Sequence, residues 1–266
     1  LSQAISFYGD SVKFKDEKEK IKSYKVDTSK YKNIISEVDL EKLIKNLNNK
    51  SIISVDTETT SLNPLSAELV GISICCSDNE AYYIPVAHKK VKSLDLQFVL
   101  KKIKPIFEDL SIKKIGQNIK YDLIVLKKYG INIFPIEDTM LISYTLDAGN
   151  NRHNMDTLSE LHLGHKTISY KEIVGSGKKQ LNFSDVNLKD ATKYAAEDAD
   201  ITLRLYNILK NRLDSEKLNK IYEVFEKPMI KLLSKLEMSG VKIDDLYLKK
   251  LSKKFKKTLI EKEKEI

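Results

Sequence analysis

Val55-Asp-Thr-Glu-Thr59 decides the fold, and it closes an apolar run that begins at Ser51. The run from residue 51 to 57 is rich in β-branched residues, which favour a strand. Residues two apart in a strand point to the same face, so Asp56 and Glu58 present their carboxylates together. Two carboxylates held against an apolar core without a partner cost roughly several kcal/mol. Their position therefore indicates a functional site rather than a structural one.

Two later segments carry acids at helical spacing. Asn118 and Asp122 lie one turn apart, as do Tyr194 and Asp198, so each pair shares a helix face. Asp200 is rotated by about 200° from Asp198 along the helix and is expected to face elsewhere. Each segment is weak evidence by itself, because Asp122 is equally typical of a solvent-facing helix acid and Asp198 of one acid on a polar face. The ordered set in one chain favours a shared site.

Convergence of four carboxylates has a chemical consequence. Like charges in one pocket repel strongly, and hard divalent cations that prefer oxygen ligands are the natural means of neutralising them. The pattern therefore predicts a two-metal nuclease site that binds Mg²⁺ or Mn²⁺. Hydrolysis of a phosphodiester at two metals needs no covalent intermediate, so the lack of a Ser-His or Cys-His nucleophile pair is consistent with it.

The charge of the chain suggests a partner but does not identify one. The protein has 266 residues, 41% of them hydrophobic, and a formal net charge of +8, and only three of its 46 basic residues are arginines. A basic balance favours a polyanion such as nucleic acid. Heavy use of lysine, asparagine and isoleucine also follows from AT-rich codons, and much of the lysine alternates with acids as on a solvated surface. Both explanations of the charge stay open.

Cysteine usage and hydropathy exclude two classes of protein. Cys75 and Cys76 are adjacent and have no C-x-x-C partner, so we expect core residues in a reducing compartment. No apolar run approaches the length of a membrane span, and we expect no membrane partner. The chain begins at Leu1 rather than Met, which suggests a processed or excised piece. Residues 1–27 are polar and lysine-rich and are expected to form an N-terminal extension.

Hydrophobic periodicity predicts an α/β protein. The first helix is expected to follow Asp39 as N-cap, and Pro105 and Pro228 are expected to kink, stop or interrupt two later helices. The strands at 69–76 and 81–86 are expected to extend the first strand into an antiparallel meander. The predicted strands are 51–57, 69–76, 81–86, 113–116 and a short piece near 133–136. The predicted helices are 40–47, 96–107, 118–129, one from about 138, 156–163, 188–213, 222–238 and one after 244.

Several segments together resemble the 3′→5′ proofreading exonuclease domain of family A, DNA polymerase I-like enzymes. The resemblance runs from about Tyr31 to Ile266. It rests on Val55-Asp-Thr-Glu-Thr59, Ile84-Pro-Val-Ala-His88, Gly116-Gln-Asn-Ile-Lys-Tyr-Asp122, Arg152-His-Asn-Met-Asp156, Tyr194-Ala-Ala-Glu-Asp-Ala-Asp200 and Leu236-Glu-Met-Ser-Gly-Val-Lys-Ile-Asp244. It implies an RNase H-like (DnaQ-like) α/β fold, a central mixed sheet flanked by helices and followed by a helical fragment. The implied domains are an exonuclease domain at 28–215 and a truncated start of a polymerase thumb at 216–266.

The resemblance also implies roles for single residues. Asp56, Glu58, Asp122 and Asp198 would bind two metal ions, and Tyr194 would orient the attacking water. A related group has His five residues before the last Asp, where this chain has Lys193, so the chain is similar to the tyrosine (DEDDy) subclass. For the DNA, Leu62 would wedge at the terminal base, Tyr121 and Tyr170 would contact or stack on bases, and sugar or phosphate would be held by Thr59, Gln117, Asn118, Lys120 and Arg152.

Ordinary structural roles are alternatives to these expected DNA contacts. Leu62 also fits ordinary loop packing, and Lys120 also fits an ordinary helix surface. Tyr170 stands where the family often has Phe, and stacking survives that change. The chain's histidines, His88 among them, need no catalytic role and are expected to be surface or locally hydrogen-bonded residues.

The implied function is a Mg²⁺-dependent 3′→5′ DNA exonuclease. It would act on a single-stranded DNA 3′ end and proofread for the polymerase domain of the same parent chain, and we expect a monomer. One alternative is a non-catalytic DNA-holding domain, whose signature of substituted acids is missing. Another is an exoribonuclease, against which the thumb-like tail after Glu223 argues. The lysine, asparagine and isoleucine bias resembles AT-rich apicomplexan proteins and implies the apicoplast lumen, with a bacterial-type cytoplasm as alternative.

Overall fold

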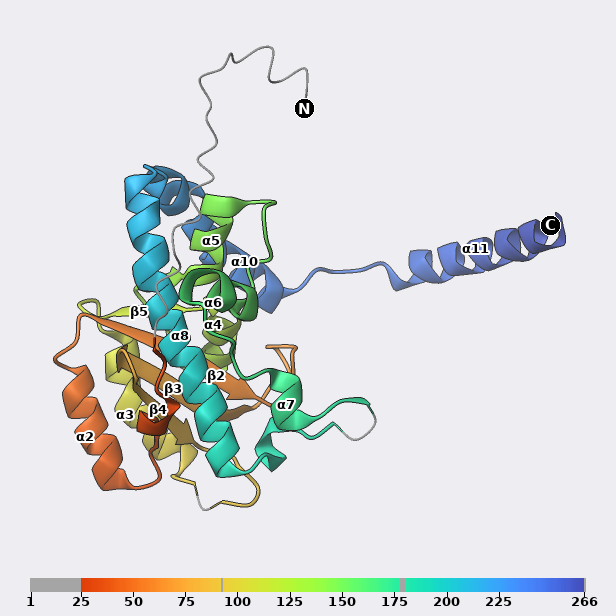
Figure 1. Ribbon diagram of the computed structural model, residues 1–266. Helices are drawn as coiled ribbons and strands as arrows, with labels where there is room; N and C mark the ends of the chain where they lie inside the picture. The colour runs from red at the N-terminus through yellow and green to blue at the C-terminus, as the bar shows by residue number, and fades with distance from the viewer. Residues whose placement is uncertain (1–24, 92, 178–179, 266) are drawn as a thin grey trace, which may run out of the picture.

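A mixed six-stranded sheet forms the centre of the protein in the computed structural model, which describes residues 25–91, 93–177 and 180–265 (Figure 1). The strand order is β1-β4-β3-β2-β5-β6. β2, β3 and β4 form the expected antiparallel meander, while β5 pairs in parallel with β2 and β6, and β1 in parallel with β4. The strands are β1 (Lys32–Asn33), β2 (Ile52–Thr59), β3 (Leu69–Ser77), β4 (Glu80–Pro85), β5 (Lys113–Gly116) and β6 (Ile136–Asp138). The central mixed sheet flanked by helices agrees with the fold that the sequence implies.

The helices connect these strands and then continue beyond the sheet. They are α2 (Glu37–Leu47), α3 (Leu96–Glu108), α4 (Ile119–Lys128), α5 (Thr139–Asp147), α6 (Met155–Leu163), α7 (Tyr170–Val174), α8 (Leu188–Ser215), α9 (Asn219–Ile221), α10 (Lys227–Ser239) and α11 (Asp245–Glu265). Short 3-10 turns cover Thr28–Lys30 and Phe183–Asp185, and a π-helical turn covers Tyr222–Glu226. Most of the predicted N-terminal extension, residues 1–24, lies outside the described residues.

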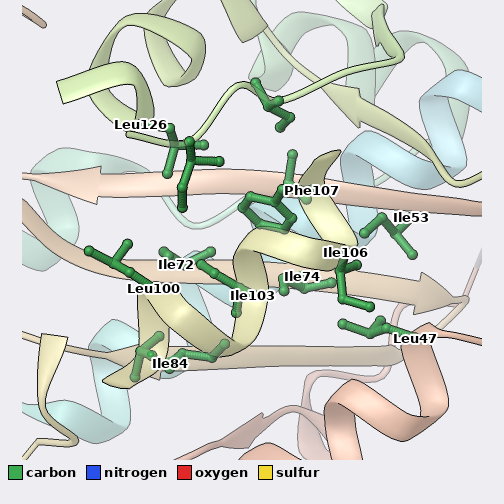
Figure 2. Close-up of a cluster of buried hydrophobic side chains, with 14 of the residues drawn as sticks. Leu47, Ile53, Ile72, Ile74, Ile84, Leu100, Ile103, Ile106, Phe107 and Leu126 are labelled. Carbon is green, nitrogen blue, oxygen red and sulfur yellow. The ribbon is translucent and has the colours of Figure 1, made fainter. Parts of the chain in front are cut away.

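Apolar side chains fill both sides of the sheet. On one side, α2, α3 and α4 pack on strand residues such as Ile53 and Ile72, and the cluster in Figure 2 also holds Phe107 of α3. On the other side, α8 crosses the sheet with α5 and α6 beside it, as Figure 1 shows, and Ile201 and Leu205 of α8 pack there. The long α8 therefore lies on the sheet face that can share a site with β2.

Three helix boundaries differ from the sequence-based expectation. Ser36 rather than Asp39 caps α2, because its side-chain oxygen accepts the N–H of Asp39 at 3.2 Å. α3 continues through Pro105 to Glu108, so the proline does not stop it early. Pro228 lies in the first turn of α10, where a missing N–H costs nothing, and the irregular segment is the π-helical turn before it.

The C-terminal helices differ in how they join the body. Ile230 of α10 is buried in the core that α2, α3 and α4 share. α11 buries none of its residues and projects away from the sheet in Figure 1. Within the described ranges, no helix is long and apolar enough to cross a membrane.

Candidate metal centre

Three carboxylates meet where β2 ends under α8. Asp56 and Glu58 extend from one face of β2, and Asp198 reaches the same place from α8, so that one oxygen of each lies within 4.8 Å of the others. Glu58 and Asp198 are buried and Asp56 is half-buried. The alternation of the strand and the register of the helix thus bring three of the four predicted acids together.

The donor set fits a hard divalent cation. Glu58 Oε1 is buried and has no hydrogen-bond partner among the described residues. Burial raises the pKa of Asp56 to about 6, and burial together with the neighbouring carboxylates raises the pKa of Glu58 and of Asp198 well above the ordinary range. Clustered oxygens that lack a positive partner are the arrangement that Mg²⁺ or Mn²⁺ would neutralise.

The fourth predicted acid, Asp122, is not among the three whose oxygens lie within 4.8 Å, but its charge interacts with that of Asp56. It is 2% exposed on α4, and its Oδ1 accepts the backbone N–H of Thr57 at 2.9 Å and the Thr57 hydroxyl at 2.6 Å. Burial and the charge of Asp56 raise its pKa well above the ordinary range. Asp122 therefore fixes β2 directly beside Asp56, and its role as a metal ligand stays a prediction.

Tyr194 stands beside the carboxylates on α8. It lies one turn before Asp198, and burial together with the charges of Asp198 and Glu58 raises its pKa well above the ordinary range. Its hydroxyl is consequently neutral at physiological pH and can donate a hydrogen bond into the site.

An aromatic wall continues from Tyr194. The Tyr170 ring stacks on Phe183 with centroids 6.3 Å apart, and the Tyr194 ring lies 6.0 Å from Tyr170 and 5.9 Å from Phe183. Sequence reasoning missed Phe183, whose one signal is a buried-type residue inside a polar loop, and it missed α7, which is too short to show a period. The wall places Tyr170, 38% exposed, next to the acids.

A cleft of about 1040 Å³ is lined by Asp56, Glu58, Asp198, Tyr170 and Tyr194. Of the predicted DNA contacts, the cleft is lined by Thr59, Leu62, Asn118, Tyr121 and Tyr170. Leu62 is 93% exposed at the cleft, as a wedge must be, and the Tyr121 hydroxyl hydrogen-bonds with Thr59. The cleft also includes Asn154, which belongs to the Arg152-His-Asn-Met-Asp156 motif, and it includes Gln180, Leu181 and Asn182, which the sequence motifs did not single out.

Three other predicted contacts do not line the cleft. Gln117 donates to the backbone oxygen of His153 at 2.7 Å and accepts from the Thr139 hydroxyl, so both ends of its amide are engaged. Lys120 forms an ion pair with Glu237 of α10. Arg152 is exposed in the connection between α5 and α6. The contacts of these three residues with DNA remain predictions. For Lys120, the ion pair with Glu237 favours the alternative of an ordinary helix surface.

One buried carboxylate, Asp138, holds the helix that presents Asn118. Its oxygens accept the N–H groups of Asn118 at 3.1 Å, Ile119 at 3.0 Å and Met140 at 2.9 Å, at the starts of α4 and α5. Asn118 has φ 60°, in the left-handed region that asparagine tolerates better than most residues. The Asp138 N–H donates to the Tyr222 hydroxyl at 3.1 Å. Asp138 therefore fixes the start of α4, and the Tyr222 hydroxyl in turn holds Asp138.

Comparison with known proteins identifies a family that this chain matches. The family described as "3'-5' exonuclease" of DNA polymerase A matches residues 31–214. DNA polymerase I of Rhizobium leguminosarum is 41% identical over 246 residues, covering 85% of this chain and 24% of its own length. The chain thus spans about a quarter of the length of such curated relatives.

Solved structures share the fold at lower identity. The polymerase domain of Pol1 from M. smegmatis, in complex with DNA primer-template and dNTP, superposes with a TM-score of 0.67 at 16% identity, covering 85% of this chain and 35% of that one. Escherichia coli RNase D, an exoribonuclease involved in structured RNA processing, gives 0.60 at 17% identity, covering 79% and 51%. At these identities the likeness concerns the fold alone.

Proposed function

Because this chain belongs to the 3′–5′ exonuclease domain family of DNA polymerase I-like enzymes, we propose that it removes nucleotides from a DNA 3′ end by two-metal hydrolysis. The observation that carries the proposal is the group of Asp56, Glu58 and Asp198 oxygens within 4.8 Å, with Glu58 Oε1 buried and without a partner among the described residues. An acid cluster of this kind lowers the stability of the fold, and such clusters are typical of sites that serve binding or catalysis.

The chemistry divides between the metals and the protein. Two Mg²⁺ or Mn²⁺ ions, when bound, would supply an activated water and stabilise the leaving 3′ oxygen. Asp56, Glu58 and Asp198 would hold them, with Asp122 reaching the second ion directly or through water. Tyr194, neutral at working pH, would donate its O–H to the attacking water and orient it in line with the scissile bond.

The rest of the cleft suits the end of a single strand. Tyr170 offers a partly exposed ring on which a base can stack, and Leu62 offers an exposed apolar wedge. Asn118 and Thr59 place polar groups on the same cleft, where sugar or phosphate would lie. Tyr121 also lines this cleft, where its hydroxyl hydrogen-bonds with the Thr59 hydroxyl and the Ser61 backbone oxygen.

We further propose that this activity proofreads for a polymerase domain in the same parent chain. The curated relatives that match the chain include DNA polymerase I enzymes, and the matching part covers 24% of their length. We propose in the same way that the whole protein acts on DNA as a monomer. An exoribonuclease activity is the competing assignment, supported only by a fold shared with enzymes such as RNase D.

The cellular location is also a proposal. The lysine-rich composition supports an apicoplast lumen, and the bacterial relatives support a bacterial-type cytoplasm. Immunofluorescence in the source cell, compared with a plastid marker, distinguishes the two.

The first experiment incubates the purified protein with 5′-labelled single-stranded DNA and Mg²⁺. A ladder that shortens from the 3′ end, and that EDTA and the Asp56→Ala, Glu58→Ala double variant abolish, is the expected result. The matched control is Glu261→Ala, Glu263→Ala, which removes two acids at the same spacing from the exposed α11. Its ladder should equal that of the wild type.

The alternatives give different results in this assay. Cleavage of a matched RNA strand at the DNA rate or faster would favour an exoribonuclease. No shortening, with DNA binding intact by fluorescence anisotropy, would overturn the exonuclease proposal and favour a DNA-holding domain.

A further inference from the structure

His88 ends the Ile84-Pro-Val-Ala-His88 segment just after β4, and the proposed reaction gives it no role. Its ring is 5% exposed, with Nδ1 3.2 Å from the Val186 backbone oxygen and Nε2 2.7 Å from the Tyr83 hydroxyl. A carbonyl oxygen only accepts, so Nδ1 carries the proton and Nε2 of the neutral ring is the acceptor. The Tyr83 O–H therefore donates to His88. Burial lowers the pKa of His88, which favours this neutral form.

The Tyr83 hydroxyl lies next to Glu58 because of a glycine. Glu58 of β2 is paired with Gly71 of β3, and the Tyr83 ring from β4 reaches across the same sheet face. A Cβ built on Gly71 would meet the Tyr83 oxygen at 2.2 Å and its ring carbons at 2.3 Å. The phenol thus occupies the space that a side chain at position 71 would fill, on the same sheet face as the Glu58 side chain.

A hydroxyl in that place is a donor near a buried carboxylate, since burial and then the charge of Glu58 raise the pKa of Tyr83. Hydrogen bonds to charged acceptors are stronger than those to neutral ones. Glu58 Oε1 nevertheless has no partner among the described residues, and the Tyr83 O–H is directed to His88. An oxygen kept free of protein donors retains its lone pairs for a cation.

We propose that His88 is a positioning residue for metal binding: by accepting the Tyr83 hydroxyl it keeps this donor off Glu58 and leaves Oε1 open to a divalent cation. The inference rests on the proposed function, in which Glu58 is a metal ligand. It assigns a task to the His88 segment that the reaction itself does not use.

A purely structural role for His88 makes a different prediction. The ring also packs 5.9 Å from Phe183, which touches Tyr170 and Tyr194 of the aromatic wall. If packing were its only role, removing His88 would loosen the wall, and a second change at Tyr83 would loosen it further. If His88 withdraws a donor, the second change should repair the first.

The test is a double-variant cycle of His88→Phe and Tyr83→Phe in the full chain, with Mn²⁺ affinity measured by isothermal titration calorimetry. We expect His88→Phe to weaken Mn²⁺ binding about tenfold, since a released hydroxyl that bonds Glu58 must be displaced by the ion. Tyr83→Phe alone should bind at least as tightly as the wild type. The double variant should return to within about threefold of the wild type, because no hydroxyl remains to compete.

Two matched controls and one further variant complete the design. His162→Phe changes a histidine of α6, and Tyr206→Phe removes a buried hydroxyl that lies 3.4 Å from Lys113 Nζ. Both should leave Mn²⁺ affinity unchanged. His88→Gln keeps an acceptor for Tyr83 and should bind Mn²⁺ more tightly than His88→Phe. The Mg²⁺ concentration for half-maximal exonuclease rate should follow the same order as the calorimetry.

Defined results overturn the inference. A double variant as weak as His88→Phe, or a His88→Phe protein that binds Mn²⁺ like the wild type, shows that the hydroxyl is not what His88 controls. If His88→Phe does not fold, a tenfold loss in Tyr83→Phe alone overturns the inference as well, and unchanged binding there supports it. Failure of the proposed function looks different: the wild type itself would bind no more Mn²⁺ than the Asp56→Ala, Glu58→Ala variant.

Discussion

Two buried aspartates of α8, only two residues apart, have opposite surroundings. Asp200 accepts the Tyr31 hydroxyl at 2.8 Å, the Asn79 N–H at 3.1 Å and the Arg204 Nε at 2.9 Å. Asp198 instead faces other carboxylates. The first acid ties the chain before β1 and the β3–β4 turn to α8, whereas the second contributes repulsion. On the same helix, Asp200 thus stabilises the fold and Asp198 destabilises it, as residues of functional sites commonly do.

Substituting Asp198 should have the largest effect of all, and it should fall on activity. Asp198→Asn is expected to lower the rate on single-stranded DNA by about 10³-fold or more, because it removes charge from the reacting centre. The melting temperature in EDTA should stay level or rise, since a repelling charge is lost. Rate measurements and thermal unfolding on one preparation check both halves. Retention of a tenth of the activity would contradict the assignment.

Substituting the paired acid should act on stability. Asp200→Asn leaves the buried Arg204 guanidinium poorly compensated, and we expect a loss of about 3 kcal/mol in the free energy of unfolding. The rate per folded molecule should remain within a few-fold of the wild type. Urea unfolding measures the first quantity and the exonuclease assay the second.

Asp78→Asn is the matched control for that experiment. Asp78 pairs with the same Arg204 at 3.2 Å but is half-exposed, so its loss should cost less than about 1 kcal/mol. Equal losses in the two variants would show that burial of Asp200 is not what matters.

The carboxylate cluster should make stability depend on pH and on metal. Burial raises the pKa of Asp56 from its ordinary 3.8 to about 6, so the folded protein binds this proton more tightly than the unfolded chain does. Its stabilising contribution is complete below about pH 4 and is lost as the pH rises through 6. In EDTA, Asp56→Asn should therefore gain about 1 to 3 kcal/mol relative to the wild type between pH 4 and 7.5.

Mg²⁺ should reverse this penalty in the wild type. At about one hundred times its dissociation constant, an ion that binds only the folded protein adds about 2.7 kcal/mol. Thermal unfolding at both pH values, with EDTA or Mg²⁺, measures the difference. A gap between wild type and Asp56→Asn that is independent of pH would show that the carboxylates are not strained.

The smallest effect is expected at the ion pair between Lys120 and Glu237. Both side chains are partly exposed, so Lys120→Met should change the free energy of unfolding by less than about 1 kcal/mol. A loss as large as that of Asp200→Asn would remove the contrast between buried and exposed pairs. Glu237→Gln removes the ion pair but keeps the lysine. If Lys120 also contacts phosphate, DNA affinity should fall in Lys120→Met and not in Glu237→Gln.

Local periodicity predicted much of this contrast. Strand alternation indicated that Asp56 and Glu58 share a face, and helical rotation indicated that Asp198 and Asp200 do not. The partners of Asp200 outside α8 could not be predicted, because Tyr31 lies 169 residues away and only the folded sheet brings it near. The same holds for the bond from Thr57 to Asp122, which joins residues 65 positions apart in the sequence.

Short elements escaped prediction for a different reason. β1 has two residues and α7 has five, so neither completes a pattern of apolar positions. The cap of α2 was misassigned because Ser36 and Asp39 are both good capping residues three positions apart, and only the hydrogen bond distinguishes them.

The shared cap at Asp138 has a mechanical consequence. One carboxylate joins the starts of α4 and α5, and its own N–H holds the Tyr222 hydroxyl at the π-helical turn that leads to α10. The π-helical turn before α10 is thus connected to Asn118 at the cleft through buried hydrogen bonds of Asp138 rather than through a flexible loop.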